Sequence, residues 1–181
     1  MPDIIQNIDW AILRGIRSSL HCGALDFIMP KITLLGNGGA FWILTGFLLL
    51  FSKKYRKYGV LLLSVLAAGA LIGTLGIKHL IARPRPFQLE DVALLIKQPS
   101  GYSFPSGHTQ ASVAGAMILT AANRKFGWFA IPLAALIAFS RLYLYVHFPS
   151  DVVGAAILAL ALGFIGLYIF KKLTAPKAEA A

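Results

Sequence analysis

Two histidines and an aspartate have a spacing that could support covalent catalysis. His147 lies four residues before Asp151, so a helix that begins between them would bring the carboxylate to one nitrogen of the imidazole. The other ring nitrogen would then be free to attack, as a nucleophile held by an orienting group. His108 is the second histidine, and an imidazole with a pKa of about 6.5 suits acid–base catalysis near neutral pH.

Basic residues and a predicted helix N-terminus accompany the histidines. Lys78, Arg85 and Arg141 supply positive charge and hydrogen-bond donors, and the two arginines could each bind phosphate oxygens through two donors. Ser106 and Gly107 stand at the start of a predicted helix, where unpaired backbone amides can bind an anion. The combination predicts a phosphate site.

Structural explanations account for some of these polar residues one at a time. If the chain lies in a membrane, as its composition indicates below, a long basic side chain can extend to the membrane surface. This would account for the position of Lys78 or of Arg83, each taken alone. It would not explain two histidines and an aspartate held in register with the basic residues. His21 and His79 have no such neighbours in the sequence, and we interpret them as structural.

The acidic residues argue against a metal site. Asp151 is the only acidic residue within the predicted constellation, whereas magnesium or two-metal sites require several carboxylates. Glu90 and Asp91 lie together in a polar stretch, and we interpret them as solvated loop residues. We therefore expect catalysis without a metal or any other cofactor.

The amino-acid composition is that of a membrane protein, so we expect membrane helices to position these residues. Hydrophobic residues make up 57% of the 181 residues and charged residues 13%, against roughly 25% charged in ordinary globular domains. Long apolar stretches without a charged residue include Ile32–Ser52, Gly59–Ile77 and Val152–Phe170. About 20 mostly apolar residues cross a bilayer as a helix, and several such stretches leave no room for a soluble shell.

The pattern predicts an all-α bundle of six transmembrane helices behind an amphipathic helix. Residues 8–20 place apolar side chains at helical spacing away from the arginines, which is typical of a helix at the membrane surface. Pro84 and Pro86 should end the third transmembrane helix. The predicted transmembrane segments are 23–35, 40–51, 59–82, 105–123, 127–144 and 149–170. The predicted organisation is an amphipathic segment 1–22, a membrane domain 23–171 and a flexible cytoplasmic tail 172–181.

The net charge of +10 gives an orientation. The basic residues form short clusters between apolar segments, which favours membrane loops over nucleic-acid binding. With six spans, the positive-inside bias places these clusters in the cytoplasm: Arg14 and Arg17; Lys53, Lys54, Arg56 and Lys57; Arg124 and Lys125; Lys171, Lys172 and Lys177. The loop 83–104 and the turn 145–150 then lie on the outer face of the cell (inner) membrane. If 23–35 only re-enters the membrane, the N-terminus changes sides.

Three motifs make the chain resemble the type-2 phosphatidic-acid phosphatase family, which shares its active-site design with vanadium haloperoxidases. The motifs are Lys-x6-Arg-Pro from Lys78 to Pro86, Pro-Ser-Gly-His from Pro105 to His108, and Ser-Arg-x5-His-x3-Asp from Ser140 to Asp151. They occur in this order and no signature residue is missing.

The resemblance implies a membrane lipid phosphatase that works through a phosphohistidine. His147 would attack phosphorus, Asp151 would hold His147, and His108 would protonate the leaving group. The phosphate would be bound by Lys78, Arg85, Ser106, Gly107 and Arg141. Among substrates we favour undecaprenyl pyrophosphate, because a compact chain with an outward site suits recycling of a lipid carrier. Phosphatidylglycerol phosphate, phosphatidate and the phosphates of lipid A stay open, and we expect the loop 87–104 to govern the choice.

Two functions of other classes compete with this hypothesis. A vanadate-dependent haloperoxidase would use a similar anion pocket, but members of that class are larger and soluble. A non-enzymatic transporter or scaffold would place polar residues through the whole depth of the membrane. Here the polar set collects at one predicted end of the bundle.

Overall fold

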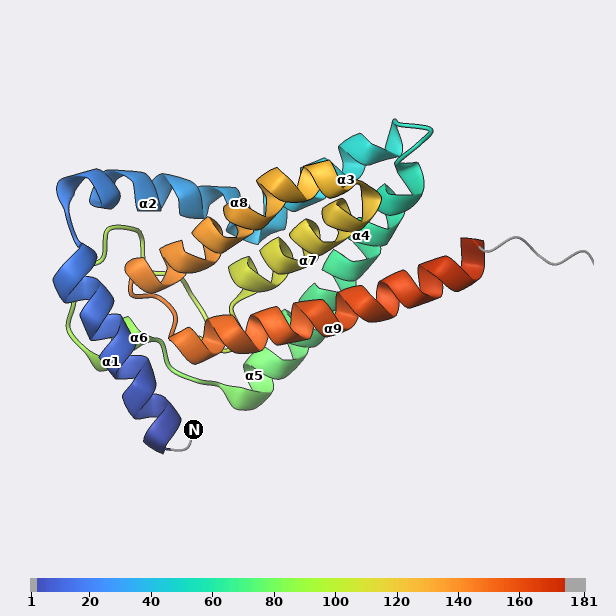
Figure 1. Ribbon diagram of the computed structural model, residues 1–181. Helices are drawn as coiled ribbons and strands as arrows, with labels where there is room; N and C mark the ends of the chain where they lie inside the picture. Colours follow the sequence, from blue (N-terminus) through green and yellow to red (C-terminus); the bar gives the residue numbers. More distant parts are fainter. Residues whose placement is uncertain (1–2, 175–181) are drawn as a thin grey trace, which may run out of the picture.

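The computed structural model describes residues 3–174, which form helices joined by short turns and one long loop (Figure 1). No β-strand occurs in this range. Residues 175–181 of the predicted tail lie outside the described part of the chain. The elements are α1 Asp3–Leu20, α2 Gly23–Leu35, the 3-10 turn η1 Asn37–Gly39, α3 Ala40–Leu50, α4 Arg56–Gly69, the π-helical η2 Ala70–Ile77, α5 Lys78–Ile81, α6 Pro86–Leu89, α7 Gly107–Ala122, α8 Arg124–Tyr143 and α9 Pro149–Thr174.

Most predicted helix ends agree with those observed to within a few residues, but α1 begins at Asp3 rather than at residue 8, and the short helix α6 was not predicted. α5 ends at Ile81, where Ala82 adopts a left-handed backbone conformation with φ 48°. Pro84 and Pro86 follow, and Pro86 becomes the first residue of the short helix α6. This turn directs the chain out of the bundle and across its end. Arg83 and Arg85 follow the turn, and their side chains reach the start of α9 and the turn between α8 and α9.

Within residues 3–174, three helical stretches are long and apolar enough to span a membrane: Arg56–Leu89, Arg124–Tyr143 and Pro149–Thr174. A fourth arises if Gly23–Leu35 and Asn37–Leu50 count as one span, since they run on from each other with a bend of 42°. Gly38 and Gly39 form this bend with φ angles of 59° and 69°, a conformation that glycine adopts without strain. Six separate spans are therefore not confirmed.

Helix α7 lies at the centre of the bundle and packs against α4, α8 and α9. Its buried positions are mostly small, including Ala114, Gly115 and Ala116, so neighbouring helices approach closely. The indole of Trp42 from α3 lies against Gly115 and donates a hydrogen bond to the Ser112 hydroxyl at 3.0 Å. Small residues on α7 thus allow large side chains from other helices to fill the core.

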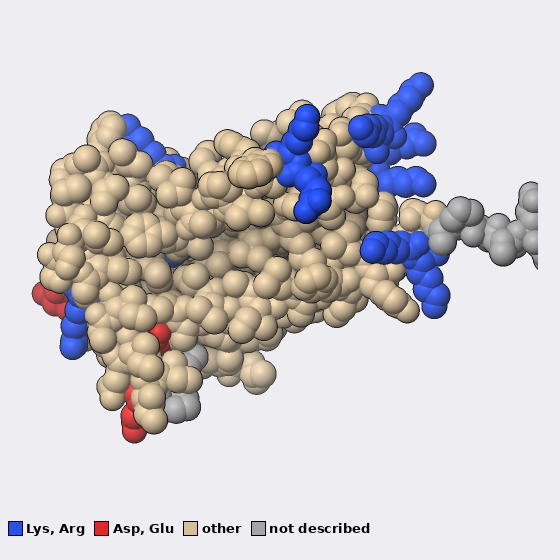
Figure 2. All heavy atoms as spheres, viewed as in Figure 1, with Lys and Arg blue, Asp and Glu red and all other residues tan. Residues whose placement is uncertain are grey.

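The outer surface of the bundle is largely apolar, and its charges gather at the ends (Figure 2). Lys and Arg side chains project from the end that carries the α3–α4 and α7–α8 turns and the end of α9. α1 lies beside α6 at the opposite end (Figure 1). Arg14 of α1 forms an ion pair with Glu90 there. The grouping of Arg14 and Arg17 with the other basic clusters is therefore wrong, because α2 and α3 run in one direction and do not form a hairpin.

The contact between Trp42 and Gly115 predicts the result of a single substitution. A methyl group on Gly115 would lie 2.2 Å from the indole ring, so we expect Gly115→Ala to destabilise the protein by about 1–3 kcal/mol through overpacking. Unfolding in detergent, followed by circular dichroism, measures this change. Gly15→Ala on α1 is the control, because the added methyl group would meet no atom within 4 Å apart from the adjacent backbone of its own helix. Equal stability of Gly115→Ala and the wild type would show that the indole moves freely.

Candidate active site

His147 lies in the buried turn between α8 and α9, and its two ring nitrogens have different surroundings. Nε2 is 3.1 Å from Nη1 of Arg85. Nδ1 is 3.4 Å from the Ser103 hydroxyl and 3.5 Å from Oδ2 of Asp151. The aspartate therefore stands on the Nδ1 side, as the sequence spacing predicts, and Nε2 faces the basic residue. This division suits an imidazole that reacts through Nε2.

Burial also sets the protonation state of His147. Removal from water disfavours the charged imidazolium and lowers the pKa of His147 to about 3, although the neighbouring Asp151 opposes the change. Arg85 and Arg141 lower this pKa further by charge repulsion. The ring is therefore neutral at neutral pH and keeps a lone pair for attack.

Asp151 occupies the first turn of α9 and is fully buried. Its Oδ2 atom accepts hydrogen bonds from the Ser103 hydroxyl and from the backbone N–H of Phe148, the latter at 2.8 Å. Its Oδ1 atom accepts one from Nη1 of Arg83 at 2.6 Å. Several donors thus stabilise a carboxylate that would otherwise be costly to bury.

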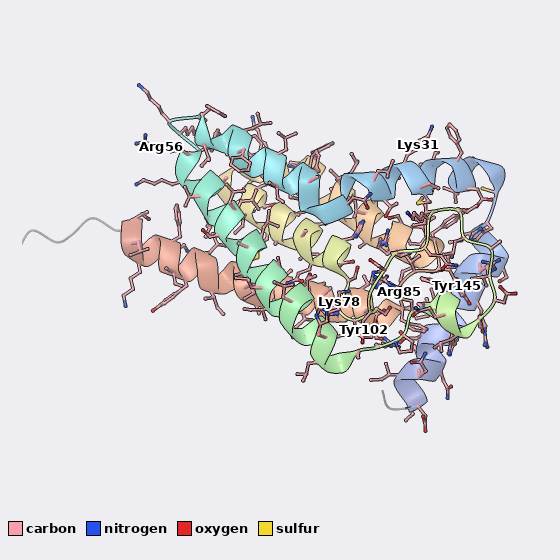
Figure 3. All side chains as sticks on the ribbon, turned by 180° about the vertical axis from the view of Figure 1, so that it is seen from behind. Lys31, Arg56, Lys78, Arg85, Tyr102 and Tyr145 are labelled. Carbon is pink, nitrogen blue, oxygen red and sulfur yellow. The ribbon has the colours of Figure 1, made fainter. Side chains whose placement is uncertain are left out.

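The predicted phosphate-binding side chains come from three different elements and converge. Lys78 begins α5 and donates to the Tyr102 carbonyl at 2.8 Å. Arg85 donates from Nε to the Gly101 carbonyl at 2.9 Å and from Nη1 to the Val146 carbonyl at 2.8 Å. Figure 3 shows Lys78, Arg85 and Tyr102 close together at this end of the bundle. Arg141 on α8 donates to the Thr33 hydroxyl. Backbone carbonyls of the long loop therefore hold two of the three cations.

The N-terminus of α7 lies beside them. The Ser106 hydroxyl caps the helix by accepting from the backbone N–H and the hydroxyl of Thr109, and its own N–H donates to the Asp151 carbonyl at 3.2 Å. Gly107 and His108 are the first two helical residues, whose amides have no acceptor within a helix. Gly107 allows a ligand to approach them closely, whereas Ser106 is fully buried.

His108 points from this helix toward the bend between α2 and α3. Its Nε2 atom lies 2.9 Å from Oδ1 of Asn37. Gly36 lies against the same imidazole, since a Cβ atom there would come within 2.5 Å of the ring. The bend at 37–39 thus forms one wall of the site and holds this histidine.

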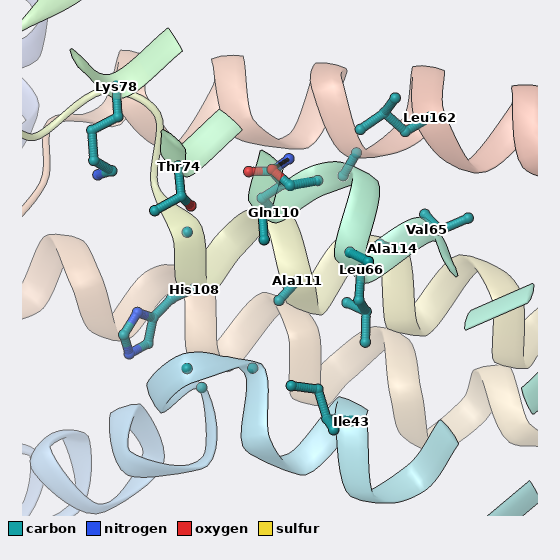
Figure 4. Close-up of a pocket in the computed structure, with 18 of the residues that line it drawn as sticks. Ile43, Val65, Leu66, Thr74, Lys78, His108, Gln110, Ala111, Ala114 and Leu162 are labelled. Carbon is teal, nitrogen blue, oxygen red and sulfur yellow. Dashed lines mark hydrogen bonds between the residues drawn. The ribbon is translucent and has the colours of Figure 1, made fainter. Parts of the chain in front are cut away.

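A cavity of about 640 Å³ joins these groups to the apolar interior (Figure 4). At one end its walls carry six of the predicted site residues: Lys78, Arg85, Gly107, His108, Arg141 and His147. Further along the walls are apolar, with Ile43, Val65 and Leu162 among the lining residues. Ser106 and Asp151 do not line the cavity: Ser106 caps α7, and Asp151 contacts His147.

Several residues of the site were missed or misinterpreted from the sequence. Ser103 and Asn37, which contact the two histidines, follow no motif that we could identify in advance. Arg83 does not snorkel, because it is buried in ion pairs with two carboxylates. Glu90 is not merely solvated: it pairs with Arg14 and accepts from the Tyr145 hydroxyl at 2.6 Å. These roles depend on contacts between distant parts of the chain.

Comparison with known proteins extends the likeness over most of the chain. The family described as "PAP2 superfamily" matches residues 57–175. Undecaprenyl-diphosphatase BcrC of Bacillus subtilis (strain 168) is 31% identical over 159 residues, which cover 87% of this chain and 82% of the relative.

Two solved structures have similar folds. The transmembrane PAP2-type phosphatidylglycerolphosphate phosphatase of Bacillus subtilis superposes with a TM-score of 0.78 at 28% identity, over 95% of this chain and 89% of that one. Aquifex aeolicus LpxE superposes with a TM-score of 0.77 at 29% identity, over 89% of this chain and 95% of that one.

The buried position of His147 predicts an unusual titration. The chain has four histidines, so nuclear magnetic resonance of isotope-labelled histidine can follow each ring, with His147→Ala identifying its signals. We expect His147 to stay neutral over roughly a pH unit on either side of 6.5, the ordinary histidine pKa, because burial lowers its pKa. His79, which is exposed, is the internal reference. A His147 ring that gains its proton near the ordinary pKa would contradict this electrostatic description.

Proposed function

The chain belongs to the PAP2 superfamily, and on this premise we propose that it is a metal-independent lipid phosphatase that works through a phosphohistidine. The observation that carries the proposal is the cavity, in which a neutral buried histidine, three cations and a helix N-terminus meet at one end of an apolar chamber. The polar end of this cavity suits a phosphate group, and the apolar remainder suits the hydrocarbon attached to it.

In the first step, Nε2 of His147 attacks phosphorus and the bond from phosphorus to the leaving oxygen breaks. The leaving oxygen takes a proton from His108, and the product lipid departs. Asp151 stabilises the positive charge that develops on His147, because it faces the other ring nitrogen. The N–P bond of the phosphohistidine holds the phosphoryl group after this step.

In the second step, a water molecule attacks the phosphohistidine and releases inorganic phosphate. His108, now without its proton, accepts one from the water, and His147 returns to its neutral state. Lys78, Arg85 and Arg141 stabilise the negative charge on the phosphoryl oxygens in both steps, together with the Gly107 amide. Ser106, which was predicted to bind phosphate, instead caps the helix that presents this amide and does not line the cavity. Positioning and charge stabilisation supply most of the catalysis in phosphoryl transfer, and this site is built from groups that do both.

We favour undecaprenyl pyrophosphate as the substrate. The cavity continues from the phosphate site between apolar side chains such as Ile43 and Leu66, which suits a long hydrocarbon chain. The similarity to an undecaprenyl-diphosphatase over 87% of this chain supports the same choice. Phosphatidylglycerol phosphate is the alternative, since a structurally similar protein is named for that activity. Pro99 and Ser100 of the long loop line the cavity, so the loop is well placed to discriminate between headgroups.

We assign the six helical segments of residues 23–171 to the membrane, with α2 and α3 together forming one bent passage. α1 would then lie along the membrane surface beside the site, where its exposed isoleucines contact lipid. The positive-inside bias applied to the remote basic end places that end in the cytoplasm. The site would then face the outer side of the cell (inner) membrane.

The first test is phosphate release by the detergent-purified protein from a panel of lipids. The panel contains undecaprenyl pyrophosphate, phosphatidylglycerol phosphate, phosphatidate and a lipid A precursor. We expect release in the presence of EDTA and its loss in His147→Ala, because the variant lacks the nitrogen that attacks phosphorus in the proposed first step. His79→Ala is the matched control, since its ring is exposed and does not line the cavity; the ring contacts the Leu75 carbonyl and the edge of the Tyr102 ring.

Each outcome of this test has a separate meaning. Inhibition by EDTA would contradict metal-independent chemistry, and full activity of His147→Ala would exclude it as the nucleophile. If no lipid releases phosphate while the protein is folded, a transporter or scaffold becomes the better description.

A second prediction compares the loss of kcat on removing His108 with the loss on removing Asn37, which contacts its ring. His108→Ala should lower kcat by roughly 10²–10⁴ through loss of acid catalysis. Asn37→Ala removes one neutral hydrogen bond to the same ring, so we expect a smaller loss, roughly two- to tenfold. Steady-state kinetics on the preferred lipid measure both. Equal losses in the two variants would mean that Asn37 itself acts on the substrate.

A further inference from the structure

Arg83 lies outside the predicted phosphate site, yet its guanidinium joins α1 to the start of α9, directly after the turn that carries His147. Nη1 donates to Oδ1 of Asp151 at 2.6 Å, and Nη2 donates to Oδ2 of Asp9 at 2.6 Å. The guanidinium carbon lies 4.0 Å from the centre of the Phe148 ring, which covers one of its faces. Arg83, Asp9 and Asp151 are all buried.

Asp9 also binds the start of α9 directly. Its Oδ1 atom accepts from the backbone N–H of Ser150 at 2.8 Å, and its Oδ2 atom accepts from the Ser150 hydroxyl. The hydroxyl of Ser150 in turn accepts from Nη1 of Arg83 at 2.7 Å. Asp9 therefore contacts both the cation and the residue immediately before Asp151.

The two oxygens of Asp151 have separate partners. Oδ1 faces Arg83, whereas Oδ2 faces Ser103, the Phe148 amide and Nδ1 of His147. A carboxylate is planar, so the strong bond at Oδ1 fixes the direction of Oδ2. Arginine suits this task because its planar fork presents donors in fixed directions to two carboxylates at once. Without Asp9, Nη2 of Arg83 would lose its charged partner and keep only the hydrogen bond to the neutral Oε1 of Gln6, at 2.8 Å.

We propose that Asp9 and Arg83 are positioning residues that hold the Asp151 carboxylate in the orientation that His147 requires, so that α1 is a part of the catalytic machinery. The proposal rests on the assignment of His147 as the nucleophile. Neither residue lines the cavity, and both act through Asp151. A purely structural anchor for α1 would change stability but would leave the environment of the His147 ring unchanged.

The kinetic test uses Asp9→Asn, which keeps the shape of the side chain but removes its charge. We expect kcat to fall on the order of tenfold, as for the loss of one orienting hydrogen bond, with little change in KM. Arg83→Gln should lower kcat at least as much, and Arg83→Lys should recover part of it. The double variant should be no slower than Arg83→Gln, because the two residues act in one chain of contacts. Asp3→Asn on the exposed part of α1 is the control.

A spectroscopic test decides the proposal independently of turnover. In histidine-labelled protein, Asp9→Asn should shift the ring signals of His147 and leave those of exposed His79 in place, whereas Asp3→Asn should shift neither. Wild-type kcat and an unmoved His147 signal in folded Asp9→Asn would overturn the proposal. If the wild type released no phosphate from any lipid, the proposed function would fail, and the His147 signal would still show whether Asp9 and Arg83 orient Asp151. Asp9→Asn remains informative even if Arg83→Gln does not fold.

Discussion

The buried carboxylate of Asp151 is the interaction on which the rest of this end of the molecule depends. An ionised carboxylate without partners is very costly inside a protein, so the surrounding chain must supply donors. The donors come from Ser103 in the long loop, from Phe148 in the turn between α8 and α9, and from Arg83 beyond α5. Satisfying one charge therefore brings together segments that are far apart in the sequence.

The long loop is held by the same need to satisfy buried polar groups. Lys78 and Arg85 donate to its carbonyl oxygens, and Glu90 near its start contacts α1 and Tyr145. Tyr145 has a left-handed backbone with φ 60°, which is uncommon for an aromatic residue and turns the chain so that His147 points inward. The long loop, the turn between α8 and α9, and helix α1 thus support each other around the cavity.

The bundle below the site has a different physical basis. Its outer surface is apolar, so hydrophobic burial from water does not hold its helices together inside a bilayer, and close packing must do so. Small residues on α7 allow this, and the bend at Gly38 and Gly39 carries α3 toward the core while leaving Asn37 beside His108. A cavity remains between these helices, with the cations at one end and apolar side chains along the rest of its walls.

The sequence by itself determined the helical class, most helix ends and the residues of the three motifs. Hydrophobic periodicity, proline positions and motif spacing are local properties, and they predicted α7, α8 and α9 within a few residues. Only the tertiary structure decided that α2 and α3 continue in one direction, that α1 lies at the site, and that Asp9, Asn37, Arg83 and Ser103 support the histidines. Spacing cannot reveal such contacts, because they join residues up to 141 positions apart and arise only when buried polar groups find partners.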